Sequence, residues 1–138
     1  MTSPAGLERN LLVLACAVSA GIHAALVPDH LAEATGAGLG FLGAAIGLAL
    51  LAVALTRRPR STAALGAASV LLAGLLVSYV LAITSGVPVL HPDPESVDGL
   101  ALFTKGVEVA GLLAAMHLLL HERGALVRVI PRTKGTTT

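Results

Sequence analysis

The sequence is poor in cysteine, aromatic and charged residues, and each shortage excludes a class of protein. The single cysteine, Cys16, excludes an intramolecular disulfide and any CxxC metal or haem-attachment motif. Only 12% of the 138 residues are charged and 55% are hydrophobic, whereas about a quarter of a soluble domain is charged. Together with a mean hydropathy of +0.86, this composition indicates an integral membrane protein. Tryptophan, which often marks the membrane interfaces, is absent, but the long apolar runs outweigh that absence.

Four apolar runs take up most of the chain. Each has about 20 residues, which at about 1.5 Å per residue is enough to cross a hydrocarbon core of roughly 30 Å. They predict membrane spans at about residues 10–27, 37–56, 62–84 and 99–120. The expected fold is therefore all-α: a single domain over residues 1–138, polytopic, with four transmembrane helices in an up-down bundle. The basic, threonine-rich tail at about residues 132–138 is expected to be disordered.

The first apolar run has a competing interpretation as a cleaved signal peptide. Val18-Ser19-Ala20 resembles a cleavage site, and Val13-Leu14-Ala15-Cys16 is similar to a lipoprotein box. Only residues 11–15 would form the apolar core before that cysteine, which is too short for a signal. We therefore interpret the run as a retained span, and a mature chain beginning near residue 16 or 21 would contradict this topology.

Positive charges are confined to one side of the predicted spans. Eight of the nine Lys and Arg residues lie in the N-terminal segment, the second connection or the tail, and the ninth, Lys105, lies inside the fourth span. The first and third connections carry acidic residues and no Lys or Arg. The positive-inside rule therefore predicts a multi-pass plasma-membrane protein with both termini cytoplasmic. Orientation and anionic lipid account for the basic residues, so no nucleic-acid partner is expected.

The segment from His23 to Glu33 concentrates polar residues in an apolar region. Its histidines and carboxylates are His23, Asp29, His30 and Glu33. Ionisable groups are costly inside a membrane and are usually placed there for a function. Pro28 predicts the end of the first span and the start of a short helix over Asp29–Thr35, closed by Gly36. The predicted orientation places this hinge at the outer mouth of the bundle.

A polar layer is predicted in the outer half of the bundle. The helical rise puts His23 about 7 Å, Lys105 about 9 Å and Glu108 about 14 Å below the outer surface. Tyr79 of the third span lies at the level of His23, and Ser19 lies at the level of Glu108. Lys105 and Glu108, three residues apart, can form an ion pair. Tyr79, Lys105 and Glu108 are therefore the predicted polar core of a ligand site, and either a structural ion pair or a proton relay fits the last two.

The favoured function is binding of a metal ion or small ligand at an outward-facing His/carboxylate site. The candidate ligands for a divalent metal, zinc or copper, are His23, His30, Glu33 and His91. Each has a plainer interpretation. His23 suits a buried neutral histidine in a structural network, His30 and Glu33 suit a solvated interfacial helix, and His91 suits an acidic outer loop.

The second span carries a stripe of glycines that suggests a different role. Gly36, Gly40, Gly43 and Gly47 share one helix face and form GxxxG twice. The stripe predicts either the packing centre of the bundle or a contact with a homo-oligomer or larger membrane complex. The alternative function is therefore a non-catalytic accessory or assembly subunit. A proton-coupled transporter is a third class, which would need oligomerisation because we detect no inverted repeat.

No catalytic motif is found. A nucleophile elbow, a P-loop and a dinucleotide fingerprint are all absent, and the four spans leave little chain for a soluble catalytic domain. The sequence therefore identifies no catalytic residue and gives no support for an enzyme.

One resemblance covers about residues 20–110. His23, the run Pro28-Asp29-His30-Leu31-Ala32-Glu33, Tyr79, Gly86-Val87-Pro88 and Glu108 resemble a group of small four-span membrane proteins of high-GC, actinobacterial-type bacteria with an H…P-[DE]-H-L-x-E motif. The resemblance implies the same four-helix architecture in a bacterial inner membrane and marks the same polar residues. It implies no particular activity.

Overall fold

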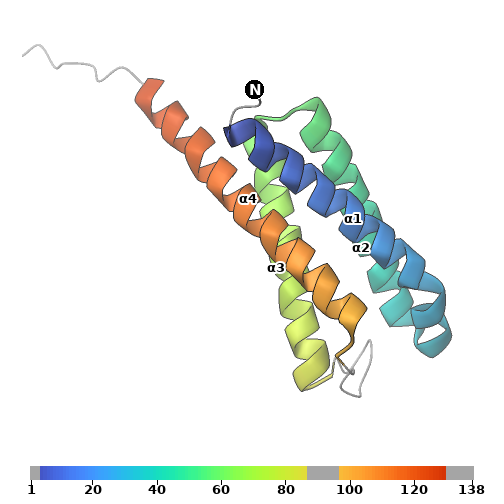
Figure 1. Cartoon of the computed structure of the whole chain (residues 1–138). Coiled ribbons are helices and arrows are strands. Elements are labelled where there is room, and N and C mark those ends of the chain that lie inside the picture. The colour runs from blue at the N-terminus through green and yellow to red at the C-terminus, as the bar shows by residue number, and fades with distance from the viewer. Residues whose placement is uncertain (1–3, 87–96, 130–138) are drawn as a thin grey trace, which may run out of the picture.

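The computed structural model describes residues 4–86 and 97–129, which form four helices (Figure 1). They are α1 (Pro4–Glu33), α2 (Thr35–Arg57), α3 (Thr62–Thr84) and α4 (Gly99–Val129). All four are long and apolar enough to cross a membrane. The expectation of an all-α chain with four such helices is confirmed. The predicted tail and His91 lie outside the described residues.

The helix ends follow local capping signals. α3 covers the predicted residues 62–84, and the hydroxyl of Ser61 accepts a hydrogen bond from the Ala64 amide at 3.2 Å. α4 starts at the predicted residue, where the Asp98 carboxylate accepts from the Ala101 amide at 2.6 Å. α4 continues nine residues past its predicted end, to Val129, because no proline or cap stops it there.

The prediction that Pro28 ends the first helix is wrong. α1 runs through Pro28 to Glu33, so the separate helix over Asp29–Thr35 does not exist. Proline removes one backbone donor, a loss that apolar helices tolerate when other groups stabilise the turn. The His30 ring makes a further contact with this turn, since its Nδ1 lies 2.9 Å from the Leu26 carbonyl oxygen.

The connection between α1 and α2 is a single extended residue, Ala34, with φ −154° and ψ 127°. So short a connection brings the last turn of α1 against the first turns of α2. A Cβ on Gly38 would lie 2.8 Å from the Leu31 Cα, so only glycine allows this approach. The helix end predicted at Gly36 lies two residues after the actual connection at Ala34, and Gly36 itself lies inside α2.

The helices pack around a closely filled apolar core. α1 packs against α2 and α4, and α3 packs against α4 and α2. We call the region of this core the apolar half; its largest buried side chains and alanines include Leu12, Cys16, Leu48, Leu55, Leu65, Ala68, Leu72, Ala115 and Leu118. A Cβ on Gly111 would lie 2.8 Å from the Ala15 Cβ, so this glycine sets the close approach of α1 and α4.

Charged contacts and apolar surface define the outside of the bundle. At one end, Arg9 and Arg60 approach the Glu122 carboxylate at 3.4 Å and 4.0 Å, and His117 lies 2.8 Å from Glu8. These pairs join the start of α1, the α2–α3 connection and the last part of α4. Figure 1 shows the start of α1 and the α2–α3 connection at the same end of the bundle. Between the ends, large apolar side chains on every helix are exposed; examples are Leu14, Leu50, Val70 and Leu113. Such a surface suits contact with lipid.

Candidate functional site

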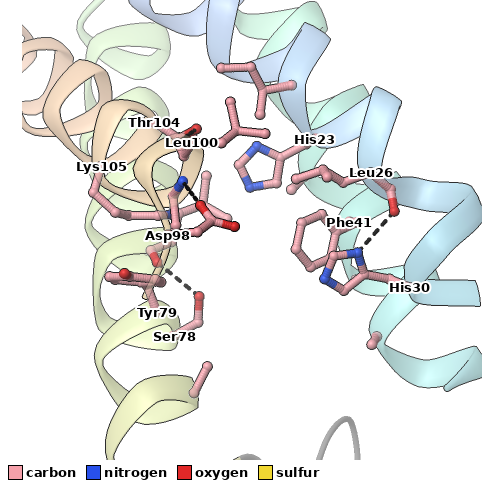
Figure 2. Close-up of a pocket in the computed structure, with 17 residues that line it drawn as sticks. His23, Leu26, His30, Phe41, Ser78, Tyr79, Asp98, Leu100, Thr104 and Lys105 are labelled. Atoms are coloured by element: carbon pink, nitrogen blue, oxygen red, sulfur yellow. Dashed lines mark hydrogen bonds between the residues drawn. The ribbon is translucent and has the colours of Figure 1, made fainter. Parts of the chain in front are cut away.

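A pocket of about 340 Å³ opens among all four helices, in the half of the bundle away from the apolar core. Its walls are mainly apolar and include Leu26, Phe41 and Leu75. Figure 2 shows the polar side chains that face one another across it, from α1 on one side and from α3 and α4 on the other. These are His23, His30, Ser78, Tyr79, Asp98, Thr104 and Lys105.

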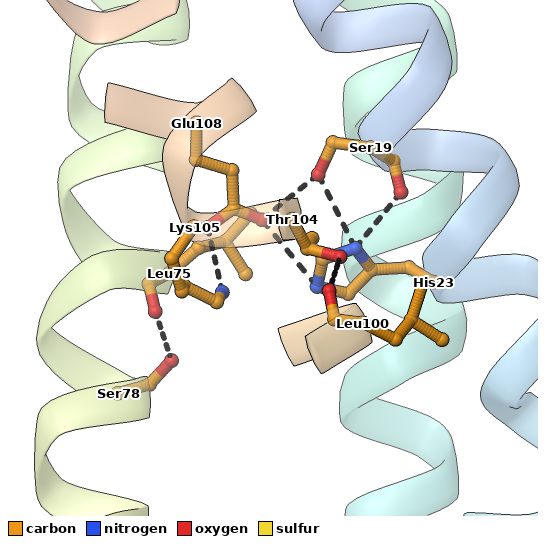
Figure 3. A network of polar contacts seen from close by, with 8 residues as sticks. All are labelled: Ser19, His23, Leu75, Ser78, Leu100, Thr104, Lys105 and Glu108. Carbon is orange, nitrogen blue, oxygen red and sulfur yellow. Dashed lines mark hydrogen bonds and ion pairs between the residues drawn. The ribbon is translucent and has the colours of Figure 1, made fainter. Parts of the chain in front are cut away.

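Beside the pocket lies a connected group of four side chains, Ser19, His23, Lys105 and Glu108, which we call the polar cluster (Figure 3). Lys105 Nζ donates to Glu108 Oε2 at 2.6 Å, and the Ser19 hydroxyl donates to Glu108 Oε1 at 2.8 Å. His23 Nε2 lies 3.8 Å from Glu108 Oε1. Glu108 is fully buried and His23 is 6% exposed. The carboxylate therefore has two donors in place of water, and its charge is balanced by Lys105.

The hydrogen bonds of His23 fix which ring nitrogen carries a proton. Nδ1 lies 2.9 Å from the Ser19 carbonyl oxygen, which can only accept, so Nδ1 is the donor in that bond. In the neutral ring, Nε2 is then an acceptor. It faces the Glu108 carboxylate, which is also an acceptor, across 3.8 Å. This side of the ring can therefore take a proton or a hydroxyl donor.

Tyr79 brings α3 to the same place. The Lys105 Nζ lies 5.3 Å from the centre of the Tyr79 ring, a cation–π distance. The Tyr79 hydroxyl is buried and has no hydrogen-bond partner among the described residues. A buried polar atom without a partner is uncommon in folded proteins.

The side chains of the predicted polar core, Tyr79, Lys105 and Glu108, lie close together. The predicted metal ligand His30 makes its contacts elsewhere. The His30 ring stacks on Phe41, with ring centres 3.8 Å apart, and bonds to its own helix. Glu33 is exposed at the end of α1. No group of three or more His, Cys, Asp or Glu side chains that could hold a metal is found within residues 4–86 and 97–129. His91 lies outside those ranges, so the predicted four-ligand set stays a prediction.

The predicted glycine stripe of α2 contributes less to packing than expected. A Cβ on Gly47 would lie 3.1 Å from a methyl group of Leu71, whereas Gly40 and Gly43 have nothing within 4 Å in the described chain. The closest helix contacts through glycine are instead made by Gly38 and Gly111. Two glycines of the stripe are therefore open on this chain.

Two residues of the site were missed or undervalued in the sequence. Ser19 was placed at the depth of Glu108 but was not counted as a site residue, although it bonds to that carboxylate. Phe41 lies 5.3 Å from His23 and 3.8 Å from His30, ring centre to ring centre. Its signal was present, since it is one of only two phenylalanines in the chain.

The fold and the site define a class: a four-helix chain of membrane-spanning composition with a buried ionic cluster beside a pocket. Searches with protein-family models, curated proteins and solved structures find no match to this chain. Function is therefore inferred from the pocket and the polar cluster themselves.

Proposed function

We propose that this protein is a multi-pass plasma-membrane protein that binds a small ligand in an outward-facing pocket beside the polar cluster. The observation that carries the proposal is the pocket of about 340 Å³, lined by all four helices, with His23, Tyr79 and Lys105 in its walls. Apolar walls with a few convergent polar groups are typical of small-molecule sites. The proposed role is binding, with no catalytic residue.

The proposed orientation is an up-down bundle with both termini cytoplasmic. Positive residues gather at the end of the bundle where Arg9, Arg60 and Glu122 meet, and cytoplasmic segments carry the excess of such residues. The pocket lies toward the other end and so faces outward.

Labelling of single cysteines tests this orientation. In a Cys16→Ser background, Asp98→Cys places a thiol at the pocket end and Arg58→Cys places one at the basic end. A membrane-impermeant maleimide added to intact cells should label only the Asp98→Cys variant, and both variants after lysis. The reverse pattern would overturn the outward-facing pocket.

A pocket-filling substitution tests ligand binding. Ala101→Phe puts a ring into the pocket, and Leu113→Phe puts the same ring on the exposed side of α4 as a control. Small molecules that co-purify from native membranes in mild detergent are extracted and compared by mass spectrometry. A compound held by the unmodified protein and by Leu113→Phe, and lost from Ala101→Phe, supports the proposal. Identical extracts from all three, with no metal bound, would remove it.

Elemental analysis of the same preparations tests the metal form of the proposal. Zinc or copper held by His23, His30, Glu33 and His91 should be present in the unmodified protein at about one ion per chain and be lost from His30→Ala. The Lys105–Glu108 pair would be unaffected by this substitution, because His30 bonds to Leu26 and not to the pair. Equal metal content in both proteins would exclude His30 as a ligand.

The second candidate function is an accessory or assembly subunit of a larger membrane complex. It is favoured by the open glycine Gly43 on α2, because small residues let a helix of another chain approach closely. A stoichiometric partner should co-purify with the unmodified protein and with the control Gly74→Leu, which is also open but lies on α3. Gly43→Leu should release it. Retention of the partner by Gly43→Leu would exclude this face as the docking surface.

A further inference from the structure

A second pocket lies at the other end of the bundle, where the start of α1 meets the α2–α3 connection (Figure 1). Its volume is about 490 Å³, and its walls are formed by Arg9, Arg58, Pro59, Arg60 and Ser61. We call it the arginine pocket, because three of these residues are arginines and none is acidic.

Hydrogen bonds hold the short connection that carries two of the arginines. The Arg58 amide donates to the Ala54 carbonyl oxygen at 2.8 Å, which ends α2. The Ser61 amide donates to the Arg58 carbonyl oxygen at 3.0 Å and so closes the turn. Pro59 stands inside this turn with its φ fixed by its ring. The arginines therefore project from a backbone with little freedom, which basic residues that only set orientation do not need.

The charges at the arginine pocket leave an excess of positive charge. Arg9 and Arg60 share the Glu122 carboxylate, at 3.4 Å and 4.0 Å. Arg58 is exposed, and its side chain has no hydrogen bond or ion pair among the described residues. Three guanidinium groups thus face one carboxylate, so two positive charges remain uncompensated.

The other charged side chains near this end do not line the pocket. Glu8 pairs with His117 at 2.8 Å and does not add to the charge of the pocket walls. Arg57 and Arg123 are exposed and lie outside the walls. They make this end basic as a whole, and Arg57, the neighbour of Arg58 in the chain, provides a matched control.

The donors within reach of a ligand suit phosphate oxygens. The Arg60 side chain is 82% exposed, and Arg58 is exposed as well. A guanidinium group presents paired N–H donors that match the oxygens of a phosphate. The Ser61 hydroxyl accepts from the Ala64 amide, so its own hydrogen can still be donated. Arg9, whose side chain is only 21% exposed, contributes mainly its charge.

We infer that the arginine pocket binds a phosphomonoester group, carried by a lipid such as phosphatidic acid or by a small soluble molecule. A monoester carries close to two negative charges near neutral pH and so balances the two uncompensated positive charges, whereas a diester carries only one. α2 ends and α3 begins beside this pocket, so in a membrane it lies at the level of the lipid head groups. The proposed orientation assigns it to the cytoplasmic leaflet. This site is separate from the pocket beside the polar cluster and does not depend on the function proposed for it.

Paired lipids test the phosphomonoester class. The protein in detergent receives equal amounts of dioleoyl phosphatidic acid and dioleoyl phosphatidylglycerol, which have the same acyl chains. The pH is about 8, where a monoester with a second pKa of about 6 is dianionic. Native mass spectrometry measures how much of each lipid the protein retains. Phosphatidic acid should be retained about tenfold more than phosphatidylglycerol, because it adds charge-assisted hydrogen bonds to the arginines.

Two arginine variants separate the pocket from the general charge of this end. Arg58→Gln removes donors from the pocket wall, and Arg57→Gln removes the same charge just outside it. The tenfold preference for phosphatidic acid should be largely lost in Arg58→Gln and kept in Arg57→Gln. Neither side chain has a partner among the described residues, so we expect both variants to fold.

A soluble probe identifies the source of the phosphate group. Binding of glycerol 3-phosphate is measured by calorimetry, with glycerol as the control. Binding that is lost in Arg58→Gln would show that the phosphate group alone is recognised, and a preference for phosphatidic acid without such binding would assign the site to a lipid. Equal retention of the two lipids with no binding of glycerol 3-phosphate would overturn the inference. An equal loss of preference in Arg57→Gln and Arg58→Gln would overturn it as well, because general charge would then be sufficient.

Discussion

The two halves of the bundle are formed by the same four helices but differ in how closely those helices pack. The apolar half is filled by leucines and small residues, and Gly111 brings α1 and α4 close together. In the other half, which we call the polar half, the helices lie far enough apart to leave the pocket, and the polar cluster lies beside it. The comparison teaches that close packing at one end allows the other end to stay open without the bundle separating.

The largest expected effect comes from breaking the ion pair in the polar half. Glu108→Gln leaves the Lys105 ammonium, whose side chain is 16% exposed, without its counter-charge. We expect a loss of about 3 kcal/mol in unfolding free energy, measured by denaturant titration in detergent.

Replacing both members of the pair is the control. Lys105→Met combined with Glu108→Leu should stay within about 1 kcal/mol of the unmodified protein, because no uncompensated charge remains. An equal loss in the single and the double variant would mean that the pair stabilises the bundle in its own right, and that the polar half is held by charge and not by packing in the apolar half.

An intermediate effect is expected at the helix contact of the apolar half. The added methyl group of Gly111→Ala meets the Ala15 Cβ at 2.8 Å and a Leu72 methyl at 3.3 Å. Overpacking of this kind should cost about 2 kcal/mol and lower the thermal midpoint. Gly106→Ala, five residues earlier on the same helix with nothing within 4 Å of its Cβ, should be neutral or slightly stabilising. Equal midpoints for the two variants would show that this contact does not hold α1 and α4 together.

The smallest effect is expected at the Tyr79 hydroxyl in the absence of ligand. Because this hydroxyl has no partner among the described residues, Tyr79→Phe should leave the unfolding free energy unchanged or raise it by up to about 1 kcal/mol. A clear loss of stability in the same denaturant titration would mean that the hydroxyl is bonded in the empty protein. It would then not be available to a ligand.

The sequence predicted the helices well wherever a span was bounded by local signals. Ser61 and Asp98 are capping residues, and α3 and α4 begin directly after them. The prediction from Pro28 was wrong because a proline inside a helix removes one backbone hydrogen bond without having to end the helix, and α1 runs to Glu33. A proline rule derived for helices in water overstates the break in a helix of this composition.

Depth along the helices was also readable, but rotation about their axes was not. Counting residues placed His23, Tyr79, Lys105 and Glu108 in one layer, and their side chains do meet. The same counting could not show that Ser19 points at Glu108 or that Phe41 stacks on His30. Those contacts depend on how each helix is turned toward its neighbours, which the weak amphipathic pattern of an apolar helix does not determine.

The position of Tyr79 has a practical consequence for spectroscopy. The chain has one tyrosine and no tryptophan, so near-ultraviolet fluorescence of the whole protein comes essentially from one side chain. That side chain lies in the pocket wall with an ammonium group 5.3 Å from its ring centre. Its intensity and lifetime are therefore a label-free optical signal of what happens at the pocket, already built into the unmodified chain.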